Sequence, residues 1–187
     1  MKVIGISGSP RKGGNTEYLL QESLEAIDRN GGKTVLIRLA EREIEPCNGC
    51  RACVELGECT IKDGVQEIYK KLIEAEAVIL ASPVFFNNVS AQMKAFMDRT
   101  WCIRGRLSNK IGGAIAVGRR YGIEGAIEAL NAYLLKHEMI LANRGVSGFA
   151  YEKGEITHDE LAITDAQRLG ERIVELVRIL RGVEKDV

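Results

Sequence analysis

An excess of charge of one sign is missing from this sequence of 187 residues, because 26 lysines and arginines are balanced by 26 aspartates and glutamates. Domains that bind nucleic acid usually carry a basic excess, so the balance gives no support to that class. It also sets the chain apart from strongly acidic carriers, which reach basic partners by long-range attraction. We therefore expect no nucleic-acid partner.

Long apolar runs are missing as well. No stretch approaches the roughly 20 apolar residues that span a membrane, so we expect no membrane partner. The chain passes from Met1-Lys2 directly into an apolar run, so no signal peptide is expected before the fold. These absences predict, by default, a location in the cytoplasm.

Apolar runs alternate with amphipathic segments along the chain, and no linker or repeat divides it, so we predict a single domain over residues 1–187. The predicted strands are 2–7, 34–39, 77–81, 111–117 and 139–143. The predicted helices are 16–30, one capped by Asp63 and Gln66, 90–101, 124–137, and one capped by Thr164 and Gln167. This succession is typical of an α/β fold with a doubly wound parallel sheet.

Irregular segments follow the strands of this predicted sheet. Ligands of such sheets bind beyond the carboxyl ends of the strands, which points to the loops after the first, third and fourth strands. A long insertion, about 45–62, follows the second strand, and residues 145–160 are expected to be irregular.

The loop after the first strand is dense in hydrogen-bond donors. Residues 8–16 read GSPRKGGNT and lead into a predicted helix, whose free N–H groups and dipole favour an anion. Ser9, Asn15 and Thr16 can donate hydrogen bonds, and Arg11 adds positive charge. A simple helix cap at Asn15 or Thr16 is the alternative, but the density of donors favours an anion site.

Two common nucleotide-binding patterns are absent from this loop. Without G-x-x-x-x-G-K-[ST] a nucleotide triphosphatase is disfavoured, and without G-x-G-x-x-G so is a dinucleotide site. A short, hydroxyl-rich loop with no evident magnesium ligand suits a phosphate monoester dianion. FMN ends in that group, so FMN is the predicted cofactor.

Two segments together resemble a known family. GSPRKGGNT resembles the phosphate loop of the NAD(P)H-dependent FMN reductases, which are flavodoxin-like proteins. SPVFFNNVSAQMKAFMDR, residues 82–99, is similar to the segment that wraps the isoalloxazine ring in that family. The match covers about residues 1–145 and implies a flavodoxin-like, five-stranded sheet of order 2-1-3-4-5. Asn87 stands where the family often has glycine.

The second segment has the chemistry that a flavin ring requires. Pro83 fixes the turn. Phe85 and Phe86 supply an aromatic wall, while Asn87 and Asn88 offer amide groups to the edge of a heteroaromatic ring. We expect one phenylalanine in the core and the other near the flavin.

The remaining predicted flavin contacts come from the turn and from the third loop. Val84 belongs to the turn, and residues 117–122 lie where the family closes the ring's other side, which adds Gly118 and Arg119. Arg119 and Arg120 could instead meet a partner, the phosphates of a pyridine nucleotide, or solvent.

Four of the five cysteines lie close together in the insertion. They are Cys47, Cys50, Cys53 and Cys59. In a chain expected in the cytoplasm, this grouping indicates a metal or redox site rather than a disulfide framework. Four thiolates on a compact loop match the ligand set of a [4Fe–4S] cube. Zinc sites more often pair two separate C-x-x-C knuckles, so zinc and free thiols are the less favoured alternatives.

The cysteine segment restricts the resemblance to one branch of this family. CNGCRACVELGECTIKD is similar to the compact cysteine motif of the iron–sulfur flavoproteins, a branch of the same flavodoxin-like group. This resemblance implies that the four cysteines are the ligands of the cluster. Cys102 lies outside the motif and is expected to act as a small hydrophobe.

The predicted function is an FMN-dependent oxidoreductase or electron-transfer protein that passes electrons between a [4Fe–4S] cluster and FMN. Ferredoxin or NAD(P)H would be the donor, and no catalytic side chain is assigned because electron transfer through flavin needs no general base. The resemblance implies a homodimer or homotetramer in which a neighbouring subunit brings cluster and flavin together.

Two other functions fit parts of the sequence. One is an NAD(P)H-dependent FMN or quinone reductase without a cluster. The other is a non-enzymatic flavodoxin-like carrier or a zinc-stabilised binding module. The neutral charge and the cysteine segment argue against a plain carrier.

Overall fold

A parallel β-sheet forms the centre of the molecule. The structure is a computed structural model that describes residues 1–183. Its strands are β1 (Lys2–Ser7), β2 (Lys33–Arg38), β3 (Ala77–Pro83), β4 (Ile111–Gly118), β5 (Ile140–Leu141) and β6 (Val146–Phe149). Their order is β2-β1-β3-β4-β5, with β6 also paired to β4. The predicted doubly wound sheet of order 2-1-3-4-5 is confirmed.

The fifth strand position is divided between two short strands, which the sequence did not indicate. β5 pairs with the start of β4 and β6 with its end, so part of the segment expected to be irregular is a strand. Gly145 lies between them with φ 116°, and a Cβ there would come within 2.5 Å of Ile127. The chain can bend this tightly over the neighbouring helix only at a glycine.

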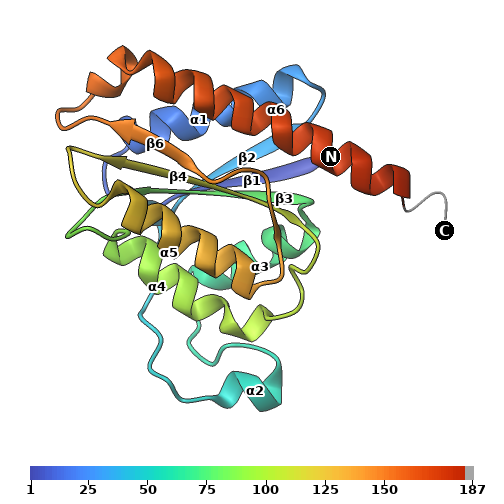
Figure 1. The fold of residues 1–187 in the computed structure, drawn as a ribbon. Helices are drawn as coiled ribbons and strands as arrows, with labels where there is room; N and C mark the ends of the chain where they lie inside the picture. The colour runs from blue at the N-terminus through green and yellow to red at the C-terminus, as the bar shows by residue number, and fades with distance from the viewer. Residues whose placement is uncertain (184–187) are drawn as a thin grey trace.

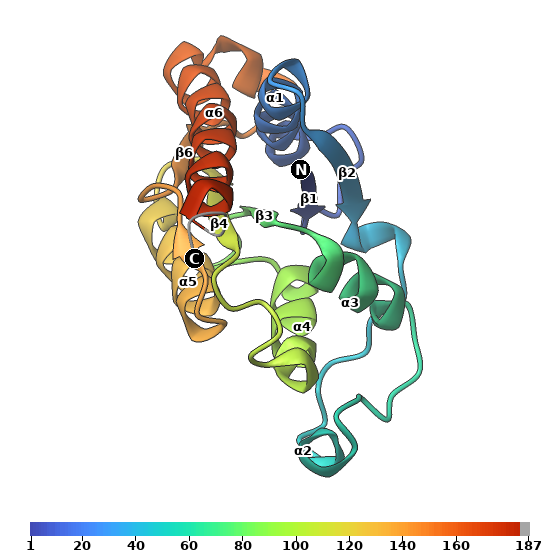
Figure 2. The same cartoon turned by 90° about the vertical axis from the view of Figure 1, so that its right-hand side faces the viewer.

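Helices cover both faces of the sheet. They are α1 (Asn15–Arg29), α2 (Ala52–Leu56), α3 (Val65–Glu74), α4 (Ala91–Arg99), α5 (Ile123–Lys136) and α6 (Glu160–Val183). Short 3-10 helices are Leu39–Glu41, Thr100–Ile103 and Glu155–His158. Figures 1 and 2 show α1 and α6 on one face and α3, α4 and α5 on the other.

Successive residues of each central strand enter opposite cores. Val3 and Ile79 pack with α1 and α6, whereas Ile4 and Leu80 pack with the helices of the other face. This alternation is the geometry of a strand that is buried on both sides. It explains why β1 and β3 appear in the sequence as continuous apolar runs.

The last helix begins earlier than its sequence pattern predicted. Asp159 accepts a hydrogen bond from the N–H of Ala162, so α6 starts at Glu160. The predicted cap at Thr164 is wrong, because its hydroxyl donates to the carbonyl of Glu160 inside the helix. Gln167 reaches Glu22 on α1 instead of closing a cap.

The cysteine loop, residues 45–62, projects from the domain on the side of α3 and α4 and carries the short helix α2 (Figure 1). It follows β2 in the chain, as the sequence predicted. Over residues 1–183, none of the helices is both long and apolar enough to cross a membrane.

Candidate functional site

Three loops converge at the carboxyl ends of β1, β3 and β4. They wall a cavity of about 240 Å³, here called the sheet-end cavity. Nine of the predicted contacts line it: Ser9, Arg11, Asn15, Thr16, Pro83, Val84, Phe85, Gly118 and Arg119. The three loops chosen from the sequence therefore form one site.

One end of this cavity is suited to an anion. Helix α1 begins there with Gly14 as its N-cap, and no side chain caps the helix. Its first N–H groups are therefore available to a ligand, and the helix dipole favours negative charge at this position. The Ser9 hydroxyl accepts a hydrogen bond from the N–H of Arg11 at 3.1 Å, which holds the loop in its turn.

Glu17, an acidic residue in the first turn of α1, does not repel an anion bound at the start of this helix. Glu17 is buried and accepts two hydrogen bonds from Arg38, at 2.7 and 2.9 Å. These hydrogen bonds lower the pKa of Glu17, which therefore stays ionised beside its cation. The pair is neutral as a unit, so the positive character of the helix end is kept.

The side chain of Asn15, which the sequence predicted to donate to an anion, instead binds the backbone of a second loop. Its side-chain amide donates to the carbonyl of Glu152 at 2.7 Å and accepts from the N–H of Gly154 at 2.8 Å. Lys153 adds a hydrogen bond to the carbonyl of Lys12. The side chain thus clamps residues 150–154 against the loop, and what Asn15 offers an anion is its backbone N–H.

The loop after β3 contains a tight hairpin. Phe85 and Asn88 exchange backbone hydrogen bonds of 2.9 and 3.1 Å, and Phe86 and Asn87 between them have φ of 49° and 61°. Two positive φ values define a turn that favours glycine or asparagine. Asn87 is therefore a sound substitute for glycine, because asparagine tolerates this conformation.

Neither phenylalanine of this hairpin lies in the core, so that part of the prediction is wrong. Phe86 is fully exposed and Phe85 is 47% exposed. Phe86 projects from the tip of a two-residue turn, where no other element covers it. A large apolar residue held at positive φ in full solvent is costly, which makes this turn a candidate for a functional role.

A second cavity of about 360 Å³ adjoins the first and shares Val84 and Arg119 with it. Phe86, Asn87, Arg120 and Tyr121 complete its wall, and all four are exposed. The predicted contact Asn88 lines neither of these two cavities, and its side-chain oxygen accepts a hydrogen bond from the N–H of Val89.

The hairpin rests on the N-terminus of α5. A Cβ at Gly122 would lie 2.4 Å from the Cα of Asn87, and one at Gly125 would lie 2.9 Å from its carbonyl oxygen. Glycine at these two positions lets the second and third loops touch. The shape of the site therefore depends on residues outside the predicted contacts.

Tyr151 and Ala150 also line the sheet-end cavity, and sequence reasoning missed both. The guanidinium of Arg119 lies 4.6 Å from the centre of the Tyr151 ring, in cation–π contact. The only signal available was a tyrosine within a segment expected to be irregular. Its place in the wall depends on β6, which brings it to the ends of the other strands.

The cysteine loop forms a separate cavity of about 300 Å³, here called the cysteine cavity. All four cysteines of the motif line it, together with Cys102, Asp98, Arg99 and Trp101. Gly49 and Gly57 have φ of 68° and let the loop turn back on itself. Cys102 is half-buried beside the core rather than fully inside it.

The thiols face one cavity but do not converge on a point. Among the described residues, no three or more histidines, cysteines, aspartates or glutamates are close enough together to hold a metal ion. A hydrogen bond from the backbone N–H of Ala52, with a second from Thr60, lowers the pKa of Cys50 and favours its thiolate. The donor set, four soft sulfurs around one cavity, fits an iron–sulfur cluster.

A buried ion pair that the sequence did not reveal closes the cysteine loop. Arg99, at the end of α4, has a fully buried side chain and pairs with Asp63 at 2.7 Å. It also donates to the carbonyls of Glu45 and Ile61, at 2.7 and 3.0 Å. Asp63 and Gln66 form the capping contacts predicted for α3, and Asp63 has this second partner as well.

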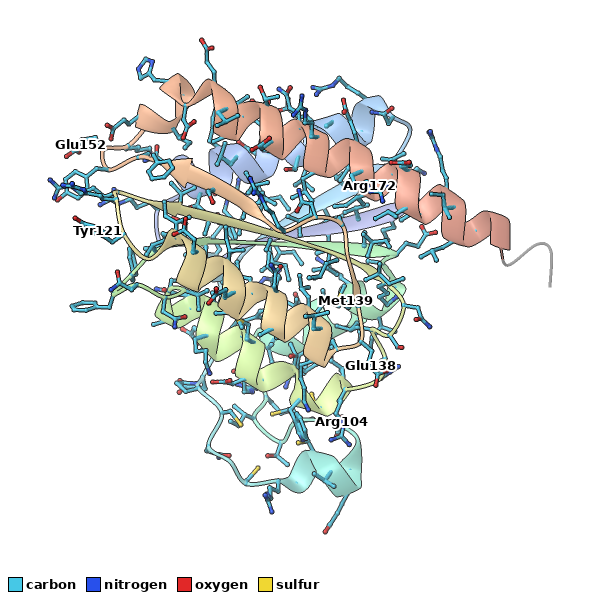
Figure 3. The ribbon with its side chains drawn as sticks, in the orientation of Figure 1. Arg104, Tyr121, Glu138, Met139, Glu152 and Arg172 are labelled. Carbon is cyan, nitrogen blue, oxygen red and sulfur yellow. The ribbon has the colours of Figure 1, made fainter. Side chains whose placement is uncertain are left out.

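The two candidate sites lie at different parts of the molecule. In Figure 3, Tyr121 and Glu152 mark the loops at one end of the sheet, and Arg104 lies next to the cysteine loop below the helices. The first site is suited to a phosphate and a planar ring, and the second to a metal cluster.

Comparison with known proteins places the chain among flavoproteins. A family model described as NADPH-dependent FMN reductase matches residues 1–153. An iron–sulfur flavoprotein of Methanocaldococcus jannaschii is 44% identical over 97% of this chain and 100% of its own length. An iron–sulfur flavoprotein of Methanosarcina thermophila is 32% identical over 97% of both chains.

A solved structure of a flavodoxin from the domain Archaea has the same fold. It superimposes with a TM-score of 0.64 over 95% of this chain and 99% of its own, at 19% sequence identity. At this identity the likeness concerns the fold alone.

Proposed function

The chain belongs to the iron–sulfur flavoprotein branch of the NADPH-dependent FMN reductase family, and we propose that it holds FMN in the sheet-end cavity and a [4Fe–4S] cluster in the cysteine cavity. It is a flavin-dependent oxidoreductase. The observation that carries the assignment of FMN is the uncapped start of α1, which opens into a cavity walled by three strand-end loops.

Each part of FMN has matching residues in this proposal. The first N–H groups of α1, the Thr16 hydroxyl and the charge of Arg11 would hold the phosphate. Pro83, Val84 and the peptide of Gly118, all of which line the cavity, would hold the ring. A Cβ at Gly118 would come within 3.0 Å of Val84, so glycine keeps the ring site open.

The chain's own residues would bind and orient the cofactors, and no catalytic side chain is assigned. When bound, FMN exchanges electrons singly or in pairs, and an iron–sulfur cluster exchanges them singly. Hydrogen bonds and solvent exposure around each site set the reduction potentials. Reduced ferredoxin or NAD(P)H is the proposed donor.

We propose further that the chain works as a homodimer or homotetramer. The separation of the two sites in one chain supports this, because cofactors exchange electrons only when they are close together. Exposed aromatic residues around the flavin loops, Phe86 and Tyr121 among them, offer apolar surface to a second copy. Sedimentation of the holoprotein measures the state, and a monomer would contradict it.

Anaerobic preparation followed by metal analysis and a visible spectrum tests the proposed function. We expect one FMN and about four iron and four sulfide per chain. Stoichiometric zinc, or bound FMN without iron, would overturn the cluster assignment. Mixing with NADPH and, separately, with reduced ferredoxin then identifies the donor from the rate at which the flavin absorbance bleaches.

A reductase without a cluster is the second candidate. The adjoining cavity favours it, because Arg119 and Arg120 there could meet the phosphates of a pyridine nucleotide. Fast bleaching by NADPH in protein that lacks iron would support this function.

Replacing Asn15 with alanine is expected to weaken FMN binding by about tenfold. The variant loses both hydrogen bonds that clamp residues 150–154, at about 0.5–1.5 kcal/mol each, and Tyr151 is then no longer held in the cavity wall. Titration of the apoprotein with FMN by fluorescence quenching measures the change. Asn143→Ala, away from the cavity, is the control, and equal affinity in Asn15→Ala and the native protein would contradict the role of the clamp.

A further inference from the structure

Arg99 is a charged residue whose side chain is completely buried. It is among the largest fully buried side chains, with a side-chain exposure of 0%, yet it lies next to a loop that is mostly exposed. Charged side chains are almost never fully buried unless they are paired. The partners of Arg99 therefore show which parts of the chain its buried side chain holds together.

The guanidinium joins the two ends of the cysteine loop. Nη1 donates to the carbonyl of Glu45 and to Asp63, both at 2.7 Å, and Nη2 donates to the carbonyl of Ile61 at 3.0 Å. Glu45 precedes the first cysteine and Ile61 follows the last. One side chain therefore closes the loop from α4, with Asp63 neutralising its charge.

The backbone of Arg99 is held as firmly as its side chain. Its carbonyl oxygen accepts hydrogen bonds from the Tyr69 hydroxyl of α3 and from the Cys102 thiol. These contacts fix the end of α4 against α3 and beside the cysteine cavity. The guanidinium thus has a defined position relative to the sulfurs.

One N–H of the guanidinium has no partner. Nε of Arg99 is buried and makes no hydrogen bond in the structure. Arg99 and Cys59 line the same cavity. Cys59 is half-buried there and packs against the same core as α3 and α4.

We propose that Arg99 is a positioning residue for the cluster: it closes the cysteine loop, and its free Nε–H is the hydrogen-bond donor to the sulfur of Cys59. This inference rests on the proposed function, since it requires a cluster on the four cysteines. A buried donor left unpaired is destabilising, and a hydrogen bond to a sulfur ligand of the cluster would remove that cost. Hydrogen bonds to ligand sulfurs are among the factors that set a cluster's reduction potential.

Arg99→Lys tests the role directly. Lysine keeps the positive charge for Asp63 but has neither the planar fork nor the Nε–H. In anaerobically prepared holoprotein, we expect unchanged FMN content, about tenfold faster loss of iron to a chelator, and a more negative midpoint potential of the cluster. Arg104→Lys is the matched control, because Arg104 is exposed and its guanidinium lies 4.4 Å from the centre of the Trp101 ring near the same loop.

The native protein supplies a second measurement that needs no folded variant. With arginine labelled by ¹⁵N at Nε, we expect one Nε–H to show hyperfine coupling to the reduced cluster. Absence of that coupling, or equal iron loss and potential in Arg99→Lys and native protein, would overturn this inference and leave the proposed function intact. Native protein without iron would overturn both.

Discussion

Cys53→Ser is expected to yield protein that binds FMN normally but retains almost no iron after anaerobic preparation. Cys53 is the third cysteine of the C-x-x-C-x-x-C run, and it lines the cysteine cavity with the other three cysteines. A serine hydroxyl is a hard, largely protonated group that binds iron poorly beside soft thiolates. We expect iron to fall from about four per chain to well below one, and the cluster absorbance to disappear.

The fifth cysteine provides the matched control for this experiment. Cys102 lines the same cavity but lies outside the motif, and its thiol is hydrogen-bonded to the carbonyl of Arg99. Cys102→Ser can keep that hydrogen bond and should retain the full complement of iron. If Cys102→Ser loses iron and Cys53→Ser keeps it, the ligand assignment is wrong.

Asp63→Asn is expected to lower the free energy of unfolding strongly. It leaves the buried Arg99 guanidinium without a counter-charge, and removing one member of a buried ion pair costs about 3–5 kcal/mol. For a chain of this size the melting temperature should fall by roughly 6–20 °C. Thermal unfolding of the apoprotein, followed by circular dichroism, measures the change without any contribution from bound iron.

An exposed ion pair on the same helix is the control for that loss. Asp98 pairs with Lys94 at 2.6 Å, and both side chains are about half exposed. Asp98→Asn should therefore cost less than about 1 kcal/mol. Equal stability losses in Asp63→Asn and Asp98→Asn would show that the Arg99 pair does not support the fold.

The effect of Asp63 should depend on pH in a defined direction. Burial alone would raise the pKa of Asp63, but the hydrogen bond from Arg99 and backbone N–H groups outweigh it, so the pKa lies below its ordinary value. A lowered pKa contributes stability that is present above about pH 4, the unfolded value, and is lost as the pH falls through the folded value. The difference in stability between the native protein and Asp63→Asn should therefore shrink below about pH 4.

The features that the sequence predicted correctly depend on neighbours in the chain. Apolar runs such as 2–7 form strands because a strand buried on both faces needs apolar residues throughout. The capping contacts between Asp63 and Gln66 join residues three apart. Residues 8–14 lead into α1, which begins at Asn15, one residue before the predicted start.

The features that the sequence missed depend on residues far apart in the chain. Asn15 binds Glu152 and Gly154, and Arg99 binds Glu45. No local pattern marks these partners, since each contact exists only once β6 has paired with β4 or α4 has packed below the sheet. The exposed position of Phe86 likewise follows from a turn that holds this residue at positive φ, a conformation that phenylalanine rarely adopts.

The sequence by itself determined the succession of strands along the chain, the three loops that meet at the sheet end, and the grouping of four cysteines in one loop. These follow from periodicity, turn residues and residue spacing, all of which are local, whereas the order of the strands in the sheet came from the resemblance to a known family. Only the tertiary structure decided that Tyr151 completes the first cavity and that Arg99 closes the loop of the second. The physical reason is that a buried polar group must find its partner, and packing alone decides which distant residue supplies it.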